Sequence, residues 1–139
     1  MQTITEDLLK ELKNTTDISA FLNRHESEFI KETVGSLLTY MINQKCMTVA
    51  EVSKCSGVGD YLYKILNDTR KPSRDVLIAV ALGMELSLEE IQLLLRVSKL
   101  AALDSRDKRD SIIIYGLINH LSAFKTDDML EQNGCTTIN

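Results

Sequence analysis

The chain contains no tryptophan, one proline, six glycines and three cysteines. So few residues that interrupt regular structure leave little room for long loops, and favour an all-helical protein with a proper core. The cysteines Cys46, Cys55 and Cys135 are odd in number and form no close pair. We therefore expect no disulfide framework, and a reducing, cytoplasmic setting.

Long apolar runs are also missing. The longest, residues 112–118, is far shorter than the ~20 residues that a membrane-spanning helix needs. Asp7, Lys10 and Glu11 interrupt the first apolar residues, so we expect no signal peptide and no membrane contact.

Recognisable catalytic motifs are absent as well. The sequence has no glycine-rich phosphate loop, nucleophile elbow or HExxH motif. His25 and His120 have no cysteine or acidic partner at a recurring metal-ligand spacing. The sequence therefore predicts no enzyme, no metal site and no cofactor.

Positive charge is scarce but unevenly placed within a net charge of -4. Residues 1–32 carry 4 basic and 7 acidic side chains, residues 33–75 carry 6 and 4, and residues 76–139 carry 6 and 9. Only the middle segment is positive. This bias favours a nucleic-acid-binding face there.

Apolar residues at helical spacing, together with capping residues, predict helices along the whole chain. The expected helices cover approximately residues 4–12, 17–24, 26–44, 48–56, 59–67, 73–83, 87–99, 107–121 and 126–133. A strand at residues 112–115 is an alternative because the run is rich in isoleucine, but no second strand exists to pair with it. We expect the tail at 135–139 to be loose.

Residues 48–73 carry the most informative pattern, two short helices joined by a glycine turn and followed by a basic turn. Thr48 and Glu51 form a capping box, and Gly57 supplies the turn. Apolar and small residues occupy the positions that a helix-turn-helix buries: Val52, Ser53, Val58, Leu62 and Ile65. The second helix of such a motif enters the DNA major groove.

At these residues the chain resembles the lambda-repressor-like, Xre-type helix-turn-helix family. The motifs are SGV at 56–58, YKIL at 63–66 and NDTRKPS at 67–73, followed by RDVLIAVALGMELSLEEIQLLL at 74–95. The flanking segments are similar to small bacterial members with helical extensions. The resemblance implies a five-helix bundle at 33–100 with extra helices at 1–32 and 101–139, all within one domain.

The outer face of the second helix supplies the candidate DNA contacts. Asp60 could select cytosine, Tyr61 could contact a phosphate or a thymine methyl group, and Lys64 could reach a guanine or a phosphate. The alternative is an ordinary solvated face, or a protein-binding face anchored by tyrosines. The remaining candidates are the helix start at Gly59, the N-terminus of the first helix at Thr48, and the turn residues Asn67, Arg70, Lys71 and Arg74.

These features predict a sequence-specific transcriptional regulator that binds double-stranded DNA, expected as a homodimer on a roughly palindromic site. The apolar segment 111–121 is the dimerisation candidate, with packing inside its own subunit as the alternative. Val49 stands where the family often has glutamine, and Asp60 would face phosphates. These two residues support a second hypothesis, a non-enzymatic adaptor that binds a protein partner.

Overall fold

The computed structural model describes residues 4–25 and 33–139, and these residues form helices and no strand. The all-helical prediction is confirmed for this part of the chain, and residues 112–115 lie in a helix. The chain divides into two compact units, Met1–Lys31 and Glu32–Asn139. Each helix in the described ranges is too short or too polar to span a lipid bilayer.

The first unit is a small helical hairpin made of α1 (Ile4–Lys13) and α2 (Ile18–Arg24). Asp17 caps α2, because its carboxylate accepts a hydrogen bond from the Ala20 amide at 3.2 Å. The Glu11 carboxylate joins the two helices through an ion pair with Arg24 at 2.9 Å and a contact with His25.

The second unit contains seven helices in residues 33–139. They are α3 (Val34–Gln44), α4 (Val49–Ser56), α5 (Tyr61–Leu66), α6 (Arg74–Met84), α7 (Leu88–Val97), α8 (Lys108–Ile118) and α9 (Ala123–Gln132). Most begin at an extended residue whose side-chain oxygen accepts a hydrogen bond from the amide three residues later. These caps, worth about 1 kcal/mol each, are Thr33, Thr48, Ser73, Ser87, Asp107 and Ser122.

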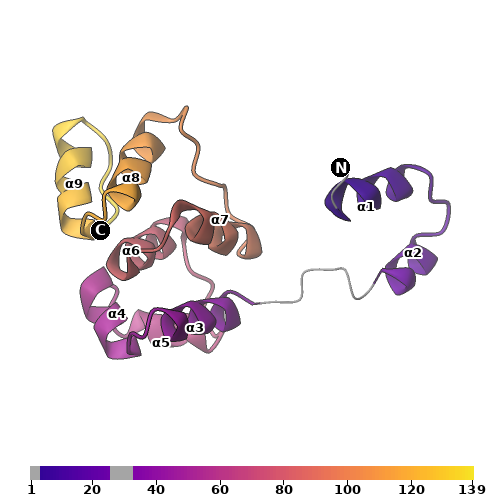
Figure 1. Ribbon diagram of the computed structural model, residues 1–139, viewed down its shortest axis with the longest axis horizontal. Coiled ribbons are helices and arrows are strands. Elements are labelled where there is room, and N and C mark those ends of the chain that lie inside the picture. The colour runs from indigo at the N-terminus through magenta and orange to yellow at the C-terminus, as the bar shows by residue number, and fades with distance from the viewer. Residues whose placement is uncertain (1–3, 26–32) are drawn as a thin grey trace. The chain divides into compact units, whose positions relative to one another are not determined.

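Helix α6 is the centre of this unit. Its residues 77–82 are all buried, and it packs against α4, α7, α8 and α9. Helix α3 packs against α5 and α7, while α8 and α9 lie side by side as a hairpin (Figure 1). The apolar side chains of α6 and of the helices around it pack together in one continuous core.

Two reciprocal ion pairs fasten α8 to the start of α6. The Arg74 guanidinium binds Asp110 through its two terminal nitrogens, Nη1 at 3.0 Å and Nη2 at 2.7 Å, and the Arg109 guanidinium binds Asp75 at 3.0 and 3.1 Å. The sequence suggests a solvated, self-neutralising stretch of alternating charges here. That interpretation is wrong for Asp110, which is 6% exposed. Bidentate geometry makes these pairs strong and directional.

Several helix boundaries differ from the sequence prediction. The helix expected at 26–44 begins at Val34, after the Thr33 cap, and residues 26–32 lie outside the described residues. Helix α5 is shorter than 59–67 at both ends. Helix α9 was expected to begin near Thr126 but begins at Ala123, because Ser122 caps it. Thr126 lies one turn inside the helix and is buried.

The tail after α9 is held in place, contrary to expectation. The amides of Ile138 and Asn139 donate to the Asp127 carboxylate at 2.6 and 3.2 Å, and Arg109 donates to the carbonyls of Thr136 and Thr137. Ile138 is 9% exposed and belongs to the core. The C-terminal residues therefore cover the α8–α9 hairpin.

Acid should destabilise the second unit through Asp110. Burial alone raises the pKa of Asp110, but the hydrogen bonds from Arg74 and the Asp104 amide, and the charges of Arg74 and Arg109, outweigh burial and hold it below its usual value. A carboxyl with a lowered folded pKa stabilises the fold above its unfolded pKa, about 3.9, and loses that contribution as pH falls through the folded value. We expect the melting temperature to fall below about pH 4.

Circular dichroism melting between about pH 2 and pH 7 measures this effect. The control is the double variant Arg74→Met with Asp110→Leu, which lacks the pair and should lose less stability in acid. Equal losses in both proteins would show that Asp110 does not contribute.

Candidate nucleic-acid interface

The turn between α4 and α5 uses two glycines in the left-handed region. Gly57 has φ +75° and Gly59 has φ +67°, a conformation that a Cβ disfavours. The Gly57 amide donates to the Lys54 carbonyl, and the Gly59 amide donates to the Ser53 carbonyl, both at 3.3 Å. These bonds close the end of α4 and redirect the chain into α5 within four residues.

The inner faces of α4 and α5 are buried at their centres, whereas Ser53 and Val58, also expected inside, are half-buried. Val52, Leu62 and Ile65 are each 0% exposed, and Ser56 is 1% exposed. The Ser56 hydroxyl donates to the Ser53 carbonyl and accepts from the Val58 amide, both at 3.3 Å. Burial of these side chains fixes the orientation of α5 about its axis. The opposite face of the helix therefore points to solvent.

The outer face of α5 holds the predicted contacts. Asp60 and Lys64 are exposed and one helical turn apart, and Asn67, the C-cap residue of α5, is exposed as well. Tyr63 is 46% exposed. The structure therefore places Asp60, Lys64 and Asn67 where a ligand could reach them.

Tyr61 makes a contact inside the protein that the sequence did not predict. Its side chain is half-buried, and its hydroxyl donates to the Lys71 carbonyl at 3.3 Å. The phenol thus ties the start of α5 to the basic turn that follows the helix. No local pattern indicates this contact, because ten residues separate its two partners.

The basic turn after α5 is rigidly held. The amides of Thr69 and Arg70 and the Thr69 hydroxyl all donate to the Lys64 carbonyl, at 3.0, 3.3 and 3.1 Å. The Asp68 carboxylate accepts from the Thr33 hydroxyl at 2.9 Å and from the Gly35 amide at 3.1 Å. This anchors the turn to the N-terminus of α3.

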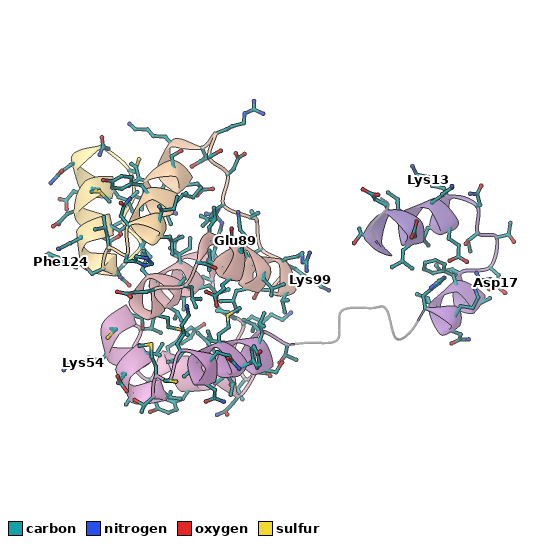
Figure 2. All side chains as sticks on the ribbon, viewed as in Figure 1. Lys13, Asp17, Lys54, Glu89, Lys99 and Phe124 are labelled. Atoms are coloured by element: carbon teal, nitrogen blue, oxygen red, sulfur yellow. The ribbon has the colours of Figure 1, made fainter. Side chains whose placement is uncertain are left out.

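Arg70 and Lys71 are exposed, and neither forms an ion pair with any residue in the described ranges. Lys54, on the outer surface of α4, is also exposed (Figure 2). The structure thus exposes basic side chains on α4, on α5 and on the turn after α5, and the charges of Arg70 and Lys71 remain available to an anionic partner.

The structure does not bring Arg74 into this group. Its guanidinium donates to the carbonyls of Ala101 and Ala102 at 2.9 and 3.1 Å, in addition to both oxygens of Asp110. The hydrogen bond with Asp110 and the charge of its carboxylate raise the pKa of Arg74 above its usual value. Four donor contacts inside the protein leave this side chain little capacity to hold a phosphate.

Thr48 begins α4 as predicted, with one feature unfavourable to an anion. Its hydroxyl accepts from the Glu51 amide at 3.1 Å, and the Glu51 carboxylate accepts from the Thr48 amide at 3.2 Å. This completes the predicted capping box. The carboxylate also occupies the helix N-terminus at which a phosphate would bind.

In residues 4–25 and 33–139, no cluster of histidine, cysteine or acidic side chains could hold a metal ion. Comparison with known proteins gave no match to any protein-family model, curated protein or solved structure.

Proposed function

We propose that the protein is a sequence-specific DNA-binding transcriptional regulator, in which α3 to α7 form a lambda-repressor-like bundle and α5 reads the major groove. One observation carries the proposal. Helix α5 buries Leu62 and Ile65 completely, while the same helix and the turn after it expose Lys64, Arg70 and Lys71. A buried inner face, an exposed polar outer face and a basic turn directly after the helix suit a recognition helix.

The residues divide between two tasks. Asp60, Lys64 and Asn67 face the base edges, where lysine suits guanine and aspartate accepts from cytosine. Arg70 and Lys71 hold phosphates, because they follow the helix on a turn fixed by hydrogen bonds. Tyr61 positions the Lys71 backbone and does not contact DNA through its hydroxyl.

Fluorescence anisotropy with pooled random duplexes at low salt tests the proposal. We expect binding that weakens with salt, at a log–log slope of about -0.9 for each phosphate contacted. The change Arg70→Ala with Lys71→Ala should weaken all sequences alike and reduce the slope by about 1.8, because two phosphate contacts are lost. Lys64→Ala should instead relax the preference at one base position.

Lys125→Ala, which removes an exposed charge from α9, is the matched control and should leave affinity unchanged. No binding at low salt would refute a DNA-binding function. That result would favour the adaptor function, which is supported by the exposure of Tyr40 (60%) and Tyr63 (46%) and by the acidic Asp60.

Homodimerisation is part of the proposed function, because a single helix-turn-helix buries little surface on DNA. The apolar segment 111–121 is largely consumed inside its own subunit. Ile113 and Leu117 are buried, Ile112 and Ile114 pack against the core, and only Tyr115 and Ile118 are largely exposed, at 55% and 62%. Most of the apolar character of α8 is therefore explained without a partner.

A further inference from the structure

An acidic side chain stands at the start of the basic turn. Asp68 precedes Arg70 and Lys71, is exposed, and forms no ion pair with any residue in the described ranges. A carboxylate at this position should oppose binding to DNA, because it repels phosphates. Neutralisation of the neighbouring cations does not explain Asp68, whereas the contacts of its carboxylate do.

Both carboxylate oxygens of Asp68 reach the first turn of α3. Oδ2 accepts from the Thr33 hydroxyl at 2.9 Å, and Oδ1 accepts from the Gly35 amide at 3.1 Å. The first amides of a helix have no acceptor in their own helix, and a negative charge is favourable there. These two hydrogen bonds, called the Asp68 clamp below, join the turn to residues 33 and 35 positions away in the chain.

The clamp requires a glycine at position 35. Gly35 is buried, and a Cβ built on it lies 2.6 Å from the Leu66 carbonyl oxygen and 2.7 Å from the Asp68 carboxylate. Helices α3 and α5 pack side by side (Figure 1), and this close approach joins the start of α3 to the end of α5. Glycine fits here, although it costs a helix about 1 kcal/mol relative to alanine.

The turn is held at both ends. The backbone of Asp68 has φ +57°, a conformation that aspartate, asparagine and glycine adopt more readily than other residues. At the other end, the Lys71 carbonyl accepts from the Tyr61 hydroxyl. Arg70 and Lys71 therefore follow one fixed point and precede or include another.

We propose that Asp68 is a positioning residue for DNA binding, whose clamp fixes the basic turn against α3 and so holds Arg70 and Lys71 ready for phosphates. A turn that is ordered before binding loses less conformational entropy in the complex. This inference rests on the proposed function. Its consequence is that an acidic residue beside the phosphate contacts strengthens binding to a polyanion.

Two substitutions of Asp68 remove the same charge but treat the clamp differently. Asp68→Asn keeps it, because the side-chain amide can accept from the Gly35 amide and donate to the Thr33 hydroxyl oxygen. Asp68→Gly suits the positive φ but has no side chain to form the clamp. In fluorescence anisotropy with pooled duplexes at low salt, we expect Asp68→Gly to bind at least about 5-fold more weakly than Asp68→Asn.

The wild-type affinity separates positioning from charge. Loss of a repulsive charge alone would make both variants bind DNA more tightly than the wild type. With the clamp, only Asp68→Asn should do so, and Asp68→Gly should bind more weakly than the wild type. Glu85→Gly is the matched control, because it also removes an exposed acid at a positive φ (+55°) but lies at the end of α6. It should leave the affinity unchanged.

Salt dependence separates positioning from direct contact. Arg70 and Lys71 remain in Asp68→Gly and still reach phosphates in the complex, so the log–log slope should stay at the wild-type value. Gly35→Ala disturbs the same clamp from α3 without changing any charge. It should weaken binding in the same way, again with an unchanged slope.

Backbone amide relaxation measured by NMR tests the clamp without DNA. The order parameters of residues 69–71 report motion on the picosecond to nanosecond timescale. They should fall in Asp68→Gly and in Gly35→Ala and keep their wild-type values in Asp68→Asn. A general defect in folding would not be confined to this turn.

Equal affinities of Asp68→Gly and Asp68→Asn would overturn the inference. So would an Asp68→Gly protein that binds more tightly than the wild type, or order parameters that do not change. Failure of the wild-type chain to bind DNA at low salt would instead refute the proposed function, and the DNA role of Asp68 with it. The two failures are distinguishable, because the variants are compared only against a wild type that binds.

Discussion

Replacing Asp110 by alanine should lower the free energy of unfolding of the second unit by about 3–5 kcal/mol, the range for breaking a buried ion pair by removing one partner. Asp110 is 6% exposed and accepts three hydrogen bonds, two from Arg74 and one from the Asp104 amide at 3.0 Å. Its removal leaves the half-buried Arg74 guanidinium without its counter-charge.

Urea unfolding at neutral pH measures this change. Asp128→Ala removes an exposed carboxylate from α9 and should leave stability within about 0.5 kcal/mol of the wild type. The double variant Arg74→Met with Asp110→Leu should recover most of the loss, because both charges are removed and apolar contacts replace them. An Asp110→Ala protein as stable as Asp128→Ala would show that the pair contributes nothing.

The same double variant separates two roles for Arg74. If Arg74 only fastens α6 to α8, the recovered protein should bind DNA with the affinity and salt slope of the wild type. If Arg74 also contacts a phosphate, the slope should decrease by about 0.9. The geometry favours the first outcome, because four donor contacts of this guanidinium already lie inside the protein.

Helix positions in the second unit could be predicted from sequence wherever a local signal existed. Thr48 with Glu51 forms the predicted capping box, and Gly57 ends α4 with a positive φ. The helices expected to begin near residues 73, 87 and 107 do so, behind the caps Ser73, Ser87 and Asp107. Each signal depends on residues within one helical turn. Such bonds join near neighbours in the sequence, so a local pattern is enough to predict them.

Contacts between distant residues could not be predicted in this way. The Arg74–Asp110 pair joins residues 36 apart in the chain, and a pattern of alternating charges near Asp110 does not indicate which one is buried. Thr126 resembles a helix start, but its side chain packs against α8, where a Cβ on Gly116 would lie 2.6 Å from the Thr126 hydroxyl. Ser122 caps α9 in its place.

In the candidate interface, too, the local features could be predicted from sequence and the contacts between distant residues could not. The alternation of apolar and polar residues correctly assigned Leu62 and Ile65 to the inner face and Lys64 to the outer face of α5. The hydrogen bond of the Tyr61 hydroxyl depends on how the chain returns after the helix, which no local pattern specifies. DNA recognition itself stays a prediction.

Substituting Gly83 with alanine should destabilise the protein, although alanine is the better helix former. Gly83 lies within α6, where glycine costs about 1 kcal/mol relative to alanine. A Cβ built on Gly83 lies 2.8 Å from the Ser56 amide nitrogen and 3.0 Å from the Cys55 carbonyl carbon. These are backbone atoms at the end of α4, so they cannot yield without moving the helix.

We expect the clash to outweigh the gain in helix propensity, for a net loss of about 1–2 kcal/mol in urea unfolding. Ala50→Gly, at an exposed position in α4, is the matched control and should cost about 1 kcal/mol. Helix propensity alone would give the two changes opposite signs, whereas the structure predicts that both destabilise. A stabilised Gly83→Ala protein would show that α4 and α6 do not approach so closely. Because α4 leads into the turn that orients α5, a shift there should also weaken DNA binding under the proposed function.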